Sequence, residues 1–89
     1  MIYLVIENFK NRNAKEIYKC LREKGRMIPV GLKYISSWIQ TDYEKCFQLM
    51  ECDDIALFRE WMSHWSDLMD FEFHSVITSK EMIEIMKDL

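Results

Sequence analysis

The sequence predicts an α+β fold in which a four-stranded antiparallel sheet carries two main helices and a short C-terminal helix. Two observations indicate this class. Segments rich in β-branched and aromatic residues alternate with segments whose apolar residues recur every three or four positions. Their order is β-α-β-β-α-β plus a terminal helix, which is the ferredoxin-like pattern. Right-handed crossovers then give the strand order 4-1-3-2, with both main helices on one face of a single domain, 1–89.

The first strand is expected at residues 2–9, where both faces are apolar over most of the length. Such a pattern is typical of a central strand that is covered on both sides. A polar turn over 10–13 follows, and Asn13 with Glu16 resembles a capping box that begins a helix. Gly25 is expected to end that helix. Its apolar face comprises Ala14, Ile17, Tyr18 and Leu21.

The remaining elements follow from the same two patterns. Strands at 32–40 and 44–52 are separated by a short polar break and should form an antiparallel hairpin. A helix over 54–66, capped by Asp53 or Asp54, carries a wide stripe of bulky apolar residues. A fourth strand at 70–77 precedes a short helix that begins with a T-x-x-E capping box and runs to about residue 87. In this last helix, we expect Met82, Ile83 and Met86 to face inward.

Charge and segment patterns exclude several classes of protein. The chain has 12 basic and 15 acidic residues, interspersed, with a net charge of -3, so we expect no nucleic-acid partner. Its longest apolar run, 1–6, is far shorter than the roughly 18 residues of a membrane span and lacks the basic flank of a signal peptide. We therefore expect a cytoplasmic protein without a membrane partner.

The cysteines and glycines indicate neither a metal nor a cofactor. Cys20, Cys46 and Cys52 form no CxxC motif, and the simplest interpretation is reduced, packed thiols. No histidine or cysteine has the spacing typical of metal ligands. Only two glycines are present, which argues against a phosphate-binding loop.

One face of the predicted sheet has no helix to cover it. Its content is apolar, and a monomer would expose a larger apolar patch than soluble monomers usually show. Burying even 600 Å² would contribute roughly 15 kcal/mol before the cost of association. We therefore expect a homodimer in which the open sheet faces pack together about a two-fold axis, as a dimeric α/β barrel.

Three stretches, GRMIPVGLKYISSW, CFQLMECDD and WMSHWSDLMDFE, resemble the small bacterial domain-of-unknown-function 3303 family. The resemblance runs from residue 1 to about residue 81. The family is similar in layout to the dimeric α/β barrel superfamily, which includes cofactor-free monooxygenases, isomerases, haem enzymes and binding proteins. The resemblance implies a fold but no activity. The matching residues are Gly25-Arg26-Met27, Pro29, Gly31-Leu32, Ser37-Trp38, Cys46 to Met50, Trp61, Trp65, Asp67-Leu68 and Asp70-Phe71-Glu72.

Two charged residues are candidates for a ligand site. Arg26 follows the helix-ending Gly25, where its guanidinium would either bind an anionic ligand or neutralise the helix C-terminus. Glu7 is the one carboxylate in an apolar central strand, where burial is costly unless the group is paired or hydrated. It would either pair with a cation across the dimer or line a wet cavity, where its pKa would be high.

Aromatic residues and histidines supply the other candidates. Trp38, Trp61 and Trp65 would either line a ligand pocket between helices and sheet or belong to the core, and Trp38 lies beside two serines on a strand, which suggests room nearby. His64, on the flank of the second helix with Asp67 one turn on, is either a general base or a surface histidine. His74, on the fourth strand, is either a pocket acid or base or an exposed or dimer-contact residue.

Two functions are compatible with these observations. In the first, the protein binds a small organic ligand, with or without cofactor-free catalysis, in a pocket of about 300 Å³ or more between sheet and helices. In the second, it is a dimeric interaction or regulatory module without a pocket, and the aromatic residues are all core or interface.

Overall fold

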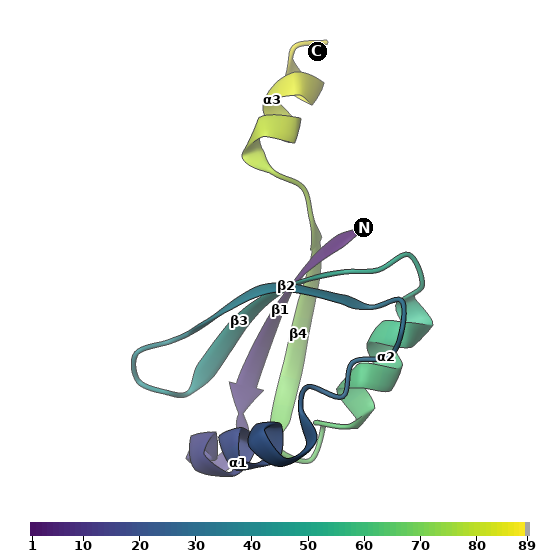
Figure 1. Ribbon diagram of the computed structural model, residues 1–89. Helices are drawn as coiled ribbons and strands as arrows, with labels where there is room; N and C mark the ends of the chain where they lie inside the picture. The colour runs from purple at the N-terminus through teal and green to yellow at the C-terminus, as the bar shows by residue number, and fades with distance from the viewer. Residues whose placement is uncertain (89) are drawn as a thin grey trace.

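The computed structural model, which describes residues 1–88, has the predicted order of elements (Figure 1). The antiparallel sheet has the order β2-β3-β1-β4, which is the predicted 4-1-3-2 order counted from the other edge. No helix within residues 1–88 is long and apolar enough to cross a membrane. The elements are β1 (Ile2–Phe9), a 3-10 helix η1 (Lys10–Arg12), α1 (Ala14–Lys24), β2 (Lys33–Ile39), β3 (Lys45–Glu51), α2 (Ile55–Ser63), β4 (Met69–Val76) and α3 (Ser79–Met86).

The register of the sheet decides which side chains meet the helices. Val5 of β1 lies opposite Gln48 of β3 and Phe73 of β4, on the face that α1 and α2 cover. Successive residues of a strand point to opposite faces, so the next residue, Ile6, belongs to the face without helices. We call this second face the open face. The buried core lies on the covered face and contains Val5, Ile17, Leu32, Met50, Cys52, Phe58, Trp61, Trp65 and Met69.

A register shift in β2 overturns the position expected for Trp38. Strict alternation would place Tyr34 and Trp38 on one face, but the pairing with β3 shifts between Tyr34 and Ser36. A bulge of this kind inserts one residue into a strand and reverses the facing of all that follow. Tyr34 therefore lies opposite Met50 on the covered face, whereas Trp38 lies on the open face and is 55% exposed.

Capping explains where most helices begin and end. The side chain of Asp54 accepts from the Ala56 N–H at 2.9 Å, and Gly25 ends α1 with φ of 68°, as predicted. The capping box expected at Asn13 is wrong, because its side chain makes no cap hydrogen bond. Its backbone already closes the preceding 3-10 turn, with the Asn13 N–H donating to the Lys10 carbonyl at 3.1 Å.

Helix α2 ends at Ser63, earlier than expected, so Trp65 lies in the turn after it and not on the helix itself. The Trp65 N–H still donates to the Met62 carbonyl, at 3.0 Å, and this continues the turning backbone for one more step. Trp65 therefore keeps its buried place in the core without belonging to the helix.

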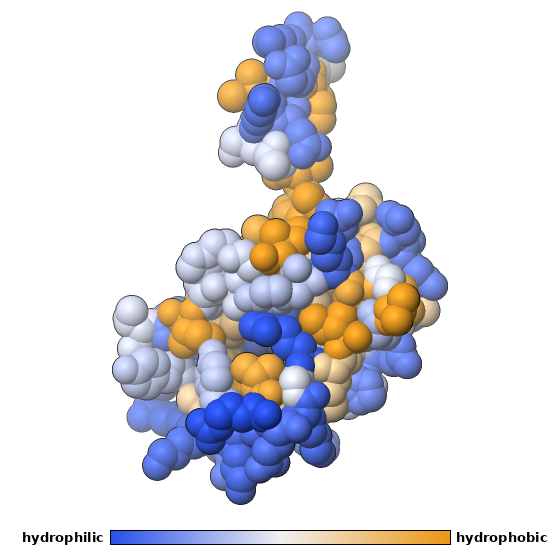
Figure 2. Space-filling view, viewed as in Figure 1, coloured by the Kyte–Doolittle hydropathy of each residue, from blue (hydrophilic) through white to orange (hydrophobic). Residues whose placement is uncertain are grey.

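Helix α3 departs from the prediction in its surroundings. Its capping box forms as expected, with the Thr78 hydroxyl accepting from the Glu81 N–H at 3.0 Å. However, none of its residues is buried, and it projects from the end of β4 away from the rest of the chain (Figure 1). Figure 2 shows hydrophobic side chains exposed along it and where it joins β4. The expected inward facing of Met82, Ile83 and Met86 is therefore wrong within one chain.

Candidate functional site

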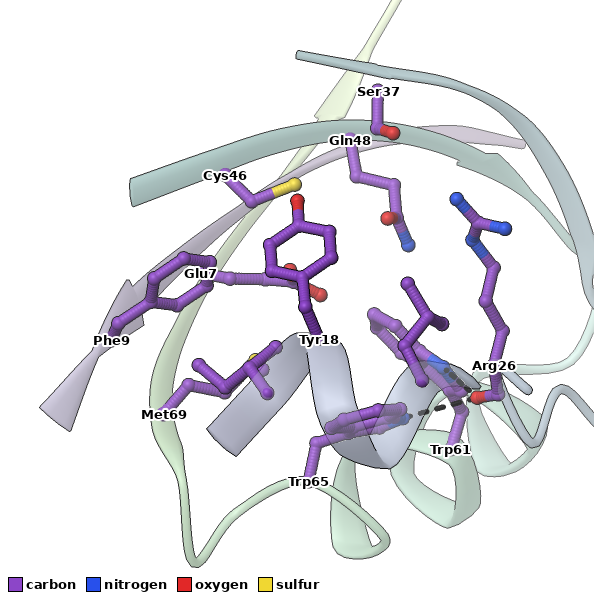
Figure 3. Close-up of a pocket in the computed structure, with 12 residues that line it drawn as sticks. Glu7, Phe9, Tyr18, Arg26, Ser37, Cys46, Gln48, Trp61, Trp65 and Met69 are labelled. Atoms are coloured by element: carbon purple, nitrogen blue, oxygen red, sulfur yellow. Dashed lines mark hydrogen bonds between the residues drawn. The ribbon is translucent and has the colours of Figure 1, made fainter. Parts of the chain in front are cut away.

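A cleft lies on the covered face, between the sheet, α1 and the two core tryptophans (Figure 3). Its cavity volume is about 60 Å³, well below the roughly 300 Å³ or more expected from the sequence for a ligand pocket. One water needs about 10–15 Å³, so the cavity has room for only a few atoms of a ligand. It is lined by Glu7, Phe9, Ile17, Tyr18, Leu21, Arg26, Ser37, Cys46, Gln48, Trp61, Trp65 and Met69.

Glu7 is the buried acid of the cleft. It sits on the central strand β1, opposite Cys46 of β3 and Phe71 of β4, and only 7% of it is exposed. Burial raises its pKa from 4.5 to about 7, against smaller opposing effects of the Cys46 hydrogen bond and the Arg26 charge. Glu7 therefore lines a cavity, where its pKa is raised, as one of the two placements open from the sequence expects.

Cys46 is a hydrogen-bond donor here and not a nucleophile. Burial raises the pKa of its thiol to about 12, and the neighbouring Glu7 carboxyl adds to the shift. The thiol is therefore protonated at neutral pH, whereas a reactive cysteine needs the thiolate. All three cysteines are free, as the sequence predicts.

Arg26 is held in place by its own backbone. The indole Nε1 atoms of Trp61 and Trp65 both donate to the Arg26 carbonyl, at 3.1 and 3.0 Å (Figure 3). The guanidinium stacks on the Tyr34 ring, 3.9 Å from its centroid. Within residues 1–88, no carboxylate lies within 4.0 Å of this guanidinium. The charge of Arg26 therefore faces the cleft without an acidic partner from the described part of the chain.

Tyr18 of α1 lines the cleft, with its hydroxyl pointing toward Cys46 (Figure 3). Burial raises the pKa of its hydroxyl, and the neighbouring Cys46 and Glu7 act in the same direction. The same side chain lines a second, shallower groove of about 400 Å³ outside the cleft. That groove is apolar apart from one lysine, and its other lining residues are Ala14, Lys15, Ile39 and Tyr43. Tyr18 therefore lines both the small cleft, which holds the polar groups, and the larger apolar groove.

The structure brings Glu7 and Arg26 together and leaves the other candidates elsewhere. Trp38 lies on the open face for the reason given above. His64 is exposed beyond the end of α2, and no hydrogen bond links it to Asp67 within residues 1–88. His74 is exposed on the open face, with Nε2 3.0 Å from Glu72 Oε1. None of the three lines the cleft.

The residues that sequence reasoning missed are Tyr18, Cys46 and Gln48. The signal for Cys46 and Gln48 is the antiparallel register, because these residues pair with Glu7 and Val5 and therefore share the covered face. Gln48 is buried, and its amide donates to the Met50 sulfur at 3.1 Å. Over residues 1–88, no three histidine, cysteine or acidic side chains gather as a metal site would require.

One of two comparisons with known proteins places the chain in a family. A search of curated proteins finds no match. The family model described as domain of unknown function DUF3303 matches residues 1–89, the whole chain. This agrees with the resemblance of the glycine-arginine, cysteine and tryptophan stretches, which include Arg26, Cys46, Trp61 and Trp65 of the cleft. The chain therefore belongs to the domain-of-unknown-function 3303 family.

Proposed function

We propose that the protein binds a small organic ligand in the cleft and acts as a homodimer of the α/β-barrel type. The observation that carries the ligand proposal is the meeting of a buried carboxyl and an unpartnered guanidinium in one otherwise largely apolar hollow. Ligand sites commonly combine apolar walls with a few convergent polar groups of perturbed pKa. Glu7 and Arg26 are the groups that would orient the ligand.

The same pair supports cofactor-free catalysis. A general acid or base works best when its pKa is near the working pH, and burial places the pKa of Glu7 at about 7. Its carboxyl would accept or donate a proton, while the Arg26 guanidinium would stabilise negative charge on the substrate. Cys46 would keep the carboxyl in position through its thiol hydrogen bond.

The shape of the chain supports a homodimer through the open face. Its accessible surface is 6374 Å², whereas a monomer of this mass is expected to expose about 5,600 Å². The difference, roughly 800 Å², is about what each partner buries in a standard interface. The radius of gyration is 14.8 Å, against about 12 Å for a compact chain of this length. A second copy covering the open face and α3 would account for both excesses.

A dimeric interaction module without a ligand is the second candidate. Two observations favour it, the small volume of the cavity and the exposed apolar side chains of α3. In that case the cleft would be a packing defect, and the functional surface would be formed by the projecting helix.

Native mass spectrometry of the purified protein tests both parts. We expect a mass near twice the 10.9 kDa of one chain, with an added ligand mass that is lost on denaturation. Phe47 lies on the open face, so Phe47→Glu should give monomers, while Val30→Glu, at a residue that is 98% exposed in a loop, should leave the dimer intact. A wild-type protein that is monomeric at micromolar concentration would refute the dimer.

The ligand part has its own control. Arg26→Met removes the guanidinium but keeps the backbone carbonyl that the tryptophans bind, so it should abolish the added mass. Arg59→Met changes an exposed arginine of α2 and should retain it. An added mass that is the same in both variants would place the ligand outside the cleft, and a dimer without any added mass would favour the interaction module.

A further inference from the structure

We infer that the ligand of this cleft is a small carboxylic acid with an apolar body, whose carboxylate sits between the Arg26 guanidinium and the Glu7 carboxyl. This inference rests on the proposed ligand-binding function and names the ligand class. It requires three features, namely a cation without a partner, a neutral acid in the same cleft, and an apolar groove that borders the cleft at Tyr18.

Arg26 provides the cation. Two indole hydrogen bonds fix its backbone, and Tyr34 supports one face of the guanidinium. The adjoining residues Gly25 and Met27 both have positive φ, 68° and 58°, so the chain turns sharply on either side of Arg26. A planar guanidinium that is held by stacking presents paired N–H donors at the spacing of a carboxylate. Because no carboxylate of residues 1–88 takes that place, the site fits one that a ligand brings.

Glu7 provides the neutral acid. A protonated carboxyl donates an O–H to a second carboxylate in a short charge-assisted hydrogen bond, whereas two ionised carboxylates repel each other. Burial already disfavours the charged form of Glu7, and a ligand carboxylate nearby would repel that form further. Binding of the ligand would therefore favour proton uptake by Glu7. The pair would then share one proton, with the remaining negative charge facing Arg26.

The groups around Glu7 set the pH range of this coupling. Cys46 of β3 and Tyr18 of α1 keep their protons at neutral pH, because burial and Glu7 raise both of their pKa values. Arg26, from the loop after α1, is the permanent charge, and Tyr34 of β2 is stacked beneath it. The neighbours from β4 and α2, which include Phe71 and Trp61, carry no charge. Glu7 is therefore the group that titrates near neutral pH.

The two hollows set the size and polarity of the ligand. The cavity of about 60 Å³ accommodates a carboxyl group and at most a few carbon atoms. The groove of about 400 Å³ on the other side of Tyr18 is lined mainly by apolar surface from Ala14, Ile39 and Tyr43. A ligand with its carboxylate inside and an aryl or alkyl body lying along the groove would use both. Tyr18 would lie against the join between the two parts.

The three tryptophans allow a direct test by nuclear magnetic resonance. In protein labelled at the indole nitrogens, phenylacetate at pH 6 should shift the signals of Trp61 and Trp65 and leave Trp38, on the opposite face, unchanged. Phenylacetamide has the same body without the charge and should bind at least tenfold more weakly. Above pH 7, phenylacetate affinity should fall about tenfold per pH unit as Glu7 ionises.

Two variants separate the roles of the charges. Arg26→Met should weaken phenylacetate binding at least tenfold at pH 6, while Arg59→Met, at an exposed position of α2, should bind as the wild type does. Glu7→Gln keeps a neutral hydrogen-bond donor, so it should bind at pH 6 and lose the fall in affinity above pH 7. The wild-type pH profile gives the same information should Glu7→Gln be poorly folded.

The outcomes distinguish this inference from the proposed function. Equal binding of phenylacetate and phenylacetamide would overturn the acid class and leave a ligand-binding cleft standing. Phenylacetate affinity that is flat from pH 6 to pH 9 would overturn the role of Glu7. Unchanged indole signals with millimolar phenylacetate would also overturn the inference, whereas the ligand-binding function would fail only if native mass spectrometry also found no added mass.

Discussion

Replacement of Glu7 by glutamine should change how the stability of the fold depends on pH. Glutamine has nearly the same shape as glutamate but no charge at any pH. In the wild-type fold, burial raises the pKa of Glu7 from 4.5 to about 7. The folded chain therefore binds this proton more tightly than the unfolded chain does. Its free energy of unfolding must fall as the pH rises from about 4.5 to about 7, and the contribution levels off on either side.

The size of the effect follows from the shift. One pKa unit corresponds to about 1.36 kcal/mol, so a shift of this size corresponds to about 3 kcal/mol. Glu7 is 7% exposed, and solvent therefore screens little of this effect. We expect the free energy of unfolding of Glu7→Gln, relative to wild type, to rise by about 3 kcal/mol between pH 4.5 and pH 8. In urea this corresponds to a relative shift of the midpoint by roughly 1–3 M.

Urea denaturation of the two proteins at pH 5, 6, 7 and 8 measures the effect. Subtracting the two curves at each pH removes the contribution of all other titrating groups. Protein concentration must be the same throughout, because dimer formation also stabilises the fold. Glu60→Gln, at an exposed residue of α2, is the matched control and should show a pH-independent difference. A difference between wild type and Glu7→Gln that stays constant from pH 5 to pH 8 would refute the assignment of a raised pKa to Glu7.

Three further predictions concern single side chains. Gly31→Ala should lower the free energy of unfolding, measured in urea, by about 1–3 kcal/mol. The added Cβ would lie 2.8 Å from Leu57 Cδ1, and the φ of +99° at this position is strained for alanine. An unchanged urea midpoint would contradict this packing. Asp54→Ala should lower it by about 1 kcal/mol through loss of the α2 N-cap, and Asp53→Ala, which makes no such bond, is the control for the same measurement. Iodoacetamide at pH 8 should leave Cys46 unmodified in the native protein, as measured by mass spectrometry, because a pKa of about 12 keeps the thiol protonated. Rapid labelling of Cys46 in the native protein would disprove its buried environment beside Glu7.

The order of elements was predictable because it depends on local patterns. Strand composition, helical spacing and the Asp54 and Thr78 caps all act over a few residues. What these local patterns do not predict is which surface each element packs against. The apolar residues of α3 recur at helical spacing, but that spacing says nothing about whether this chain or another covers them.

The candidate site was predictable where single residues stood out and not where register mattered. Glu7 stood out as a carboxylate in an apolar strand, and Arg26 as a cation beside a helix-ending glycine. Trp38 was misplaced because a bulge between Tyr34 and Ser36 changes the facing of the strand, and an extra residue of this kind leaves no clear mark in the composition. Cys46 enters the site only through its pairing with Glu7 across the sheet.

The relation between Glu7 and Arg26 argues for a site and against a packing defect. Opposite charges in one cleft would ordinarily pair, and pairing would bring the pKa of the carboxyl below its usual value. Here burial outweighs the Arg26 charge, because the tryptophan hydrogen bonds and the Tyr34 ring hold the guanidinium more than 4.0 Å from any carboxylate of residues 1–88. A chain built for stability alone would gain about 3 kcal/mol at neutral pH from an uncharged residue at position 7. Residues that lower stability in this way are characteristic of binding and catalytic sites, where the ligand supplies the partner that a buried polar group lacks in the free protein.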